Sequence, residues 1–179
     1  LQHRSIRRQR HSSLKPALTI AHHANATLGM PSILPGPAAS KDAIRLALQS
    51  WPDVDQYLQN CKGIIVPLGS TEQHGPTGAI GTDALTAEAV ALELGRLSGV
   101  LVTPVQAFGM AEHHLGFAGT ISLQPATLLA VMHDLVISLA THGFERILVV
   151  NGHGGNIATS KAAFAQAYGP AASRNLEVA

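Results

Sequence analysis

The sequence predicts an α/β protein, a three-layer α/β/α sandwich with a mainly parallel sheet. Short apolar runs at 63–68, 100–105 and 146–150 alternate with segments of helical periodicity. Such alternation produces parallel strands joined by right-handed crossovers. Hydrophobic residues make up 46% of the 179 residues and charged residues 13%, which excludes a disordered chain and indicates one domain with a packed core.

Two short helices are expected before the first strand. Ser40 can cap the first helix, whose apolar residues begin at Ile44. Pro52 suits the first turn of the second helix, which runs to about Leu58. The run at 63–68 is apolar throughout, which is typical of a strand buried on both faces.

Three further helices and two strands complete the expected fold. A helix over 83–97 precedes a strand at 100–105, and a proline opens a long helix over 125–142. A strand at 146–150 precedes a last helix over 155–167. Four large apolar residues of the helix over 83–97 are expected to face the core: Leu85, Val90, Leu92 and Leu94.

Charge divides the chain into a basic extension, residues 1–40, and a folded domain, residues 41–179. Residues 1–41 hold six basic and no acidic residues, whereas residues 42–179 hold six basic and eleven acidic ones. The extension is either an organelle transit peptide or a leader or tail without structure. Because the domain is mildly acidic and no apolar run reaches the roughly 18–20 residues of a membrane span, we expect a soluble cytoplasmic protein without nucleic-acid or membrane partners.

Polar residues gather directly after two of the expected strands. Glu72 and His74 lie two positions apart, so an extended loop would put both on one side. Asp83 stands at a helix start, where one carboxylate oxygen can cap backbone N–H groups. His153 follows the third strand among the glycines of 151–156, which let the backbone approach a ligand closely. Because ligands gather beyond the carboxyl ends of parallel strands, we expect these four side chains to converge.

Two carboxylates and two imidazoles are suitable ligands for Zn²⁺ above all, and also for Mn²⁺ or Fe²⁺. If Asp83 bridges, the set makes most of a two-metal site with ions roughly 3.5–4 Å apart, which would activate water for attack on an amide carbonyl. Each residue also has an ordinary interpretation: Glu72 as a surface carboxylate, Asp83 as a helix cap and His74 as a loop residue. The loop over 151–156 could instead cradle a phosphate, although it lacks the Lys-Ser/Thr of a P-loop.

The loop after the second strand offers further polar side chains. Glu112, His113 and His114 can line the pocket, or they can lie in a solvated loop with the two histidines on opposite sides. We assign Glu112 or His113 to passing a proton to the leaving nitrogen. Three residues of the glycine-rich loop are assigned to substrate binding: Gly154, Gly155 and Asn156.

Four motifs in the same order resemble the creatininase (creatinine amidohydrolase) family. They are PLGSTEQHGP at 67–76, GTD at 81–83, the stretch from Gly109 to Ser122, and NGHGGN at 151–156. The resemblance implies a binuclear metal centre, hydrolysis of non-peptide C–N bonds in small cyclic or linear amides, and a homo-oligomer, commonly a hexamer. By position it implies that Glu72 and His153 bind one ion, His74 binds the other, and Asp83 bridges the two.

Two departures from the family pattern limit this inference. Creatininase has a glutamate two residues past the motif histidine as a ligand of the second ion, and this chain has Gly155 there. The family also has a downstream segment with a His-Ala-Gly signature and a glutamate, so the domain is expected to be C-terminally truncated. The alternative to an amidohydrolase is therefore a catalytically inactive metal-binding or assembly paralogue, or a fragment, of the same family. Relatives that include a formamidopyrimidine deformylase and a mycofactocin-system peptidase leave the substrate open.

Overall fold

The computed structural model of the chain describes residues 42–171 and 177–178. The basic extension expected over residues 1–40 therefore lies outside the described residues. None of the helices in the described part of the chain combines the length and the apolar character that crossing a bilayer would need.

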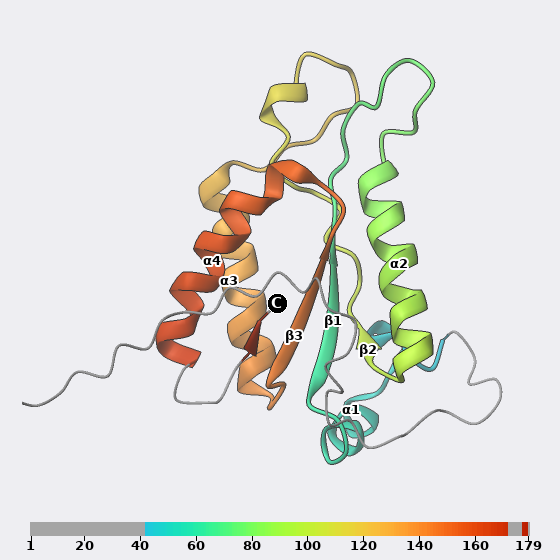
Figure 1. The fold of residues 1–179 in the computed structure, drawn as a ribbon, viewed down its shortest axis with the longest axis vertical. Helices are drawn as coiled ribbons and strands as arrows, with labels where there is room; N and C mark the ends of the chain where they lie inside the picture. The colour runs from blue at the N-terminus through green and yellow to red at the C-terminus, as the bar shows by residue number, and fades with distance from the viewer. Residues whose placement is uncertain (1–41, 172–176, 179) are drawn as a thin grey trace, which may run out of the picture.

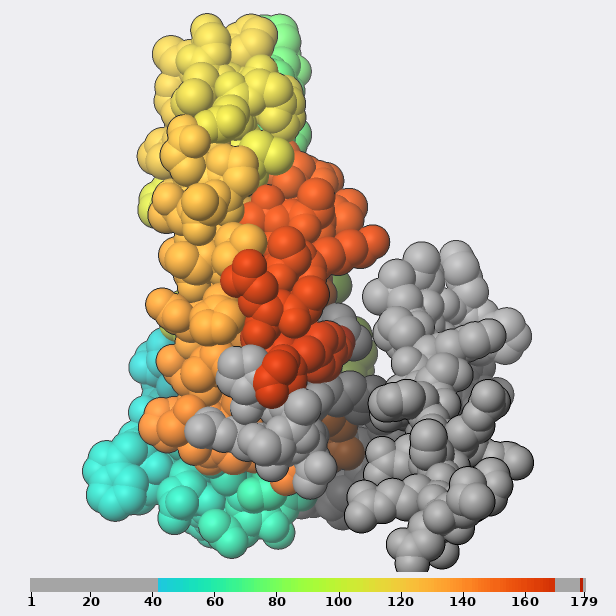
Figure 2. Space-filling view, turned by 90° about the vertical axis from the view of Figure 1, so that its left-hand side faces the viewer, coloured from blue at the N-terminus to red at the C-terminus, as the bar shows by residue number. Residues whose placement is uncertain are grey.

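The described residues form three layers (Figure 1). Helix α2 (Thr82–Ser98) covers one face of the sheet, while α3 (Pro125–Thr141) and α4 (Ile157–Ala171) cover the other. This arrangement confirms the predicted α/β/α sandwich. The segment just before α3, yellow in Figure 2, forms the end of the molecule that extends beyond α4.

The sheet has the strand order β2-β1-β3-β4, and all of its paired strands are parallel. The central strands β1 (Gly63–Leu68) and β3 (Arg146–Asn151) pair along their whole length, so that Leu68 lies opposite Asn151. Strands β2 (Leu101–Val102) and β4 (Glu177–Val178) are short edges. Because β1 and β3 end in register, the loops that follow them leave the sheet side by side.

Strand β1 is buried on both faces, as its apolar run predicts. Ile64 and Val66 pack into the core under α3, while Ile65 joins the smaller core under α2. Helix α3 also has the predicted period. Its fully buried residues recur every four positions along one face: Leu128, Met132 and Val136.

Helix α1 (Trp51–Leu58) begins where Pro52 predicts, and a capping box of Ser50 and Asp53 satisfies its first N–H groups. The prediction of a first helix around Ile44 is wrong, because the chain beside Ile44 runs along the edge of the sheet. The Val102 N–H donates to the Ile44 carbonyl at 2.8 Å, and only Leu46–Leu48 forms one 3₁₀ turn, η1.

The second strand is shorter than the expected 100–105. Pro104 has no N–H to donate, and the last hydrogen bond to β1 before it runs from the Thr103 N–H to the Ile65 carbonyl at 2.9 Å. The chain then returns to the sheet at a single bridge between Gln106 and Leu68. Strand β4 was not expected from the sequence.

The buried face of α2 differs from the expected one. Leu85, Val90 and Leu94 are 61%, 51% and 39% exposed, and Leu92 is half-buried. The residues that face the sheet are small: Ala84, Ala87, Ala91 and Gly95. A Cβ at Gly95 would lie 2.6 Å from Val102 Cγ2, so small side chains allow α2 to lie close against the sheet. Leu92 packs at the border of the core under α2, as expected, whereas Leu85 and Leu94 are exposed.

We expect Gly95→Val to destabilise the fold by roughly 1–3 kcal/mol, because the new side chain has no room against Val102 and the carbonyl of Val100. Leu94→Val is the matched control, since it places the same residue on the exposed side of α2 and is expected to cost less than about 0.5 kcal/mol. Urea unfolding midpoints of the two variants measure the difference. Equal midpoints would contradict the close packing of α2 against the sheet.

Candidate metal centre

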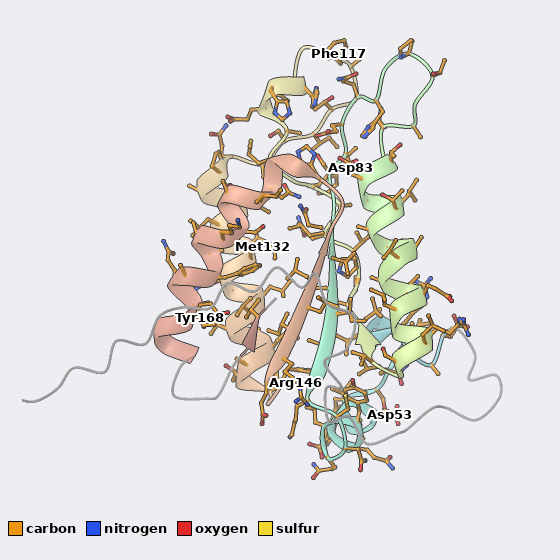
Figure 3. All side chains as sticks on the ribbon, in the orientation of Figure 1. Asp53, Asp83, Phe117, Met132, Arg146 and Tyr168 are labelled. Atoms are coloured by element: carbon orange, nitrogen blue, oxygen red, sulfur yellow. The ribbon has the colours of Figure 1, made fainter. Side chains whose placement is uncertain are left out.

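The candidate site lies where β1, β3 and the start of α2 meet. The loop after β1 carries Glu72 and His74, the first turn of α2 carries Asp83, and the loop after β3 carries His153. Figure 3 shows Asp83 at the end of α2 nearest to these loops. A Cβ at Gly152 would overlap the Asp83 carbonyl, so this glycine lets the loop after β3 touch the helix start.

Asp83 lies between the two imidazoles. Its Oδ1 is 3.0 Å from His74 Nε2, and its Oδ2 is 3.0 Å from His153 Nδ1. The other nitrogen of His153, Nε2, lies 3.2 Å from Glu72 Oε2 and 2.9 Å from the carbonyl of Met110. The structure therefore brings together the four side chains that the sequence expects to converge. Glu72, Asp83 and His153 each offer one ligand atom, and these atoms lie within 4.8 Å of one another.

The cluster contains two carboxylate side chains that are shielded from solvent. Glu72, Asp83 and His153 are 5%, 8% and 5% exposed. Among the described residues, the ion pairs of both carboxylates involve histidines and neither an arginine nor a lysine. Burial of an ionised carboxylate costs free energy unless a positive charge compensates it. Two carboxylates with imidazole nitrogens beside them are therefore a donor set that fits a divalent cation.

His74 is more accessible than the rest of the cluster, with 29% of its side chain exposed. Its Nδ1 donates to the backbone carbonyl of Glu72 at 3.1 Å. This hydrogen bond raises the pKa of His74, and the neighbouring Asp83 carboxylate raises it further against the opposing effect of desolvation. A cation that binds at Nε2 therefore competes with a proton more strongly than it would at an ordinary imidazole.

The residues expected to carry a proton lie in a short 3₁₀ turn, η2 (Glu112–His114), before α3. Glu112 is exposed, and the ring of the exposed His113 stacks on His153 with 6.1 Å between centroids. Their catalytic assignment stays a prediction. His114 is half-buried and reaches the cluster directly, with Nε2 3.5 Å from Glu72 Oε1.

The glycine-rich loop that the sequence assigns to substrate binding contains a 3₁₀ turn, η3 (Gly154–Asn156). Asn156 is fully buried, and its side-chain amide joins three loops. Its Nδ2 donates to the Gly69 carbonyl at 2.9 Å, and its Oδ1 accepts from the Met110 N–H at 3.0 Å. The structure thus uses Asn156 to hold the loops of the site together, while Gly154 is exposed.

Gly155 occupies the place of the glutamate expected in creatininases, and the structure leaves no room for a side chain there. A Cβ at this position would overlap His153 Nε2 and would lie 2.5 Å from the Met110 carbonyl. A larger residue would have to move the imidazole that faces both carboxylates.

Sequence reasoning missed two polar residues, one that contacts the cluster directly and one that contacts it through His114. The buried Ser70 donates from Oγ to Glu72 Oε2 at 3.0 Å. Gln73 contacts His114 Nδ1 through its side-chain Nε2 at 2.9 Å. Both belong to the PLGSTEQHGP motif. Ser70 lies two residues before Glu72, and Gln73 lies between Glu72 and His74, so their proximity to the candidate ligands in the sequence could have identified them.

We expect Asn156→Ala to destabilise the fold by about 2 kcal/mol or more, because it leaves the buried Gly69 carbonyl and Met110 N–H without partners. The control is Asn60→Ala, since the exposed Asn60 makes one long hydrogen bond of 3.4 Å within its own helix end. Thermal unfolding of both variants measures the difference. A loss no larger than that of the control would show that Asn156 does not hold the loops together.

Comparison with known proteins supports the resemblance noted in the sequence. The Creatininase family model, described as creatinine amidohydrolase, matches residues 47–177. A mycofactocin precursor peptide peptidase of Mycobacterium ulcerans (strain Agy99) is 39% identical over 112 residues, which are 58% of this chain and 44% of that protein. A creatinine amidohydrolase of Pseudomonas putida is 34% identical over 95 residues, which are 50% of this chain and 36% of that protein. The chain thus spans less than half the length of these curated relatives.

Solved structures share the fold. A crystal structure of creatinine amidohydrolase (creatininase) superposes with a TM-score of 0.73 at 25% identity, covering 76% of this chain and 56% of that one. Two further structures have a TM-score of 0.71 and the same coverage. One is described as a mutant creatininase of the Zn-Zn type, at 25% identity, and the other as creatininase Mn, at 26%.

Proposed function

We propose that this chain, which belongs to the creatininase family, is a metal-dependent amidohydrolase that cleaves a non-peptide C–N bond in a small amide. The observation that carries the proposal is the buried cluster of Glu72, Asp83 and His153, whose ligand atoms lie within 4.8 Å of one another. Two relatives described as a creatinine amidohydrolase and a peptide peptidase support the reaction class, since both names describe hydrolysis of a C–N bond.

Each residue of the cluster has a place in this proposal. Glu72 and His153 would hold one cation, His74 would hold a second, and Asp83 faces both imidazoles and would bridge. When bound, a divalent cation lowers the pKa of a coordinated water and polarises the amide carbonyl. We assign protonation of the leaving nitrogen to Glu112 or His113, because these two side chains are exposed and the ring of His113 stacks on His153.

The donor set favours Zn²⁺ and also suits Mn²⁺ or Fe²⁺, since it mixes imidazole nitrogens with carboxylate oxygens. Solved creatininases described as Zn-Zn and Mn types support this choice. Two further points stay predictions. They are the homo-oligomer, commonly a hexamer, that the family resemblance implies, and the cytoplasmic location.

A catalytically inactive metal-binding or assembly paralogue is the second candidate. Gly155 favours it, because the position that would supply a further carboxylate for the second cation has no side chain and no space for one. Turnover of an amide substrate distinguishes the two candidates.

We expect the purified chain to bind at least one equivalent of Zn²⁺ and His153→Ala to lose this binding, because the variant removes the imidazole that lies between both carboxylates. Isothermal titration and metal analysis after dialysis measure the stoichiometry. His133→Ala is the matched control, since His133 lies on α3 beside Asp134 and away from the cluster. Wild-type protein without bound metal, or equal loss in the control, would refute the metal site.

We expect the Zn²⁺-loaded chain to hydrolyse creatinine or another small cyclic or linear amide, and Glu72→Gln to abolish the reaction because the amide fills the same volume without the charge. Release of the product amine or carboxylate, measured by mass spectrometry over a panel of amides, tests this. His133→Ala is expected to retain turnover. A loaded, folded chain that cleaves none of the panel would favour the inactive paralogue.

A further inference from the structure

Gln73 lies where two loops of the site join. Its N–H donates to Thr120 Oγ1 at 3.3 Å. Beside it, Thr71 and Ile121 form an antiparallel bridge, in which the Ile121 N–H donates to the Thr71 carbonyl at 2.9 Å. The loop after β1, which carries Glu72, is thereby fixed to the segment before α3, which carries His114.

The side-chain amide of Gln73 has one possible orientation. The Gly75 N–H lies 2.9 Å from Oε1, and a peptide N–H can only donate, so its partner is the carbonyl oxygen of the amide. The NH₂ group of Gln73 therefore faces His114 Nδ1, at 2.9 Å. Because an NH₂ group also only donates, Nδ1 of His114 is the acceptor, and a neutral His114 ring carries its proton on Nε2.

Nε2 of His114 lies on the side of the ring nearest to Glu72. Nε2 of His114 lies 3.5 Å from Glu72 Oε1, and the two side chains are 24% and 6% exposed. The other carboxylate oxygen, Oε2, accepts from Ser70 Oγ at 3.0 Å and lies 3.2 Å from His153 Nε2. The two oxygens of Glu72 thus face different partners, and Oε2 is the one that faces His153.

We propose that Gln73 and His114 are positioning residues that orient Glu72 for cation binding. Gln73 fixes the tautomer of His114, and the Nε2–H of His114, 3.5 Å from Oε1, restrains rotation of the Glu72 carboxylate, so that the group is already oriented when a cation binds. This inference rests on the metal site proposed above, and it assigns neither Gln73 nor His114 as a ligand.

The physical gain is pre-organisation. The last side-chain torsion of a glutamate is broad, so a carboxylate with free oxygens has to be ordered when a cation binds. The hydrogen bond from Ser70 to Oε2 and the approach of His114 Nε2 to Oε1, at 3.5 Å, order the Glu72 carboxylate beforehand, as partners outside the ligand set do in other metal sites. Since Nδ1 of His114 is occupied by Gln73 and Nε2 carries the proton, this imidazole has no free lone pair for the cation.

The first test reads the tautomer of His114 in the metal-free protein. At about pH 8.5, well above the ordinary imidazole pKa of about 6.5, long-range ¹H–¹⁵N NMR of histidine-labelled protein is expected to show His114 protonated at Nε2. In Gln73→Met, which has a similar length and no amide, the signal is expected to become a mixture of both tautomers. A wild-type His114 protonated at Nδ1, or an unchanged signal in Gln73→Met, overturns the proposal.

The second test measures Zn²⁺ affinity by competition with a chromogenic chelator. Gln73→Met and His114→Leu are expected to weaken binding roughly 10–100-fold, the usual effect of removing a partner that orients a ligand. His114→Gln is expected to restore most of the affinity, because its amide nitrogen can take the place of Nε2 as a donor. His133→Leu is the control for the loss of a histidine elsewhere, and it is expected to bind as tightly as the wild type.

The outcomes separate this inference from the proposed function. If the wild-type chain binds Zn²⁺ and His114→Leu binds it as tightly, the positioning role is wrong and the metal site stands. If His114→Gln binds as weakly as His114→Leu, the donated hydrogen bond is not the cause and the positioning role is again wrong. If the wild-type chain binds no cation, both proposals fall. Circular dichroism identifies variants that fail to fold. If a variant fails to fold, the tautomer of His114 in the wild-type protein still tests whether Gln73 places the proton on Nε2.

Discussion

Two buried carboxylates at one end of a parallel sheet impose the main constraint on this molecule. Glu72 and Asp83 are 5% and 8% exposed, and the ion pairs that the described residues make with them come from histidines. A salt bridge to an arginine or lysine would balance their charge permanently. Histidines instead can give up their protons, so the same residues can balance the carboxylates as imidazolium ions or share a cation with them. The cluster is therefore suited to exchange protons for a metal.

The convergence of these side chains depends on small residues in the backbone around them. A Cβ at Gly69 would overlap Ala84 Cα, and one at Gly152 would overlap the Asp83 carbonyl. The first turn of α2 thus rests on the loops after β1 and β3, which leave the sheet side by side because Leu68 and Asn151 are in register. Farther along α2, alanines and Gly95 continue the same close contact, so the packing of the helix and the position of Asp83 have one cause.

Sequence reasoning was reliable where one physical factor decides the structure. The uniformly apolar run at 63–68 indicated the central strand β1, because a strand between two helical layers is buried on both faces. The run at 146–150 indicated β3 as well, although that strand is only partly buried. Sequence reasoning failed where two physical factors compete. In α2, hydrophobicity favoured burial of Leu85 and Val90, but the distance to the sheet selects small residues. At 100–105, β-branched residues favoured a longer strand, but Pro104 interrupts the ladder.

In the candidate site, the residues that follow strands could be predicted, whereas those in irregular loops could not. Parallel topology alone places Glu72 and His153 at one sheet edge. Nothing in the pair of histidines after Glu112 indicates which one faces inward, since that depends on a single 3₁₀ turn. The amide of Gln73 resolves the question only in three dimensions, because its partners lie 2 and 41 residues away in the sequence.

The two proposed cation positions are unequal, and the reason lies in the ligands rather than in the fold. Glu72 and His153 are nearly closed off from solvent, and Ser70, His114 and the Met110 carbonyl contact them from outside the ligand set. His74 is 29% exposed in its side chain and its pKa is raised, first by its hydrogen bond to the Glu72 carbonyl, so a cation there competes with water and with a proton. Gly155 adds no carboxylate there, so the second position has fewer protein ligands than the first, and this difference is what separates the proposed amidohydrolase from the inactive paralogue.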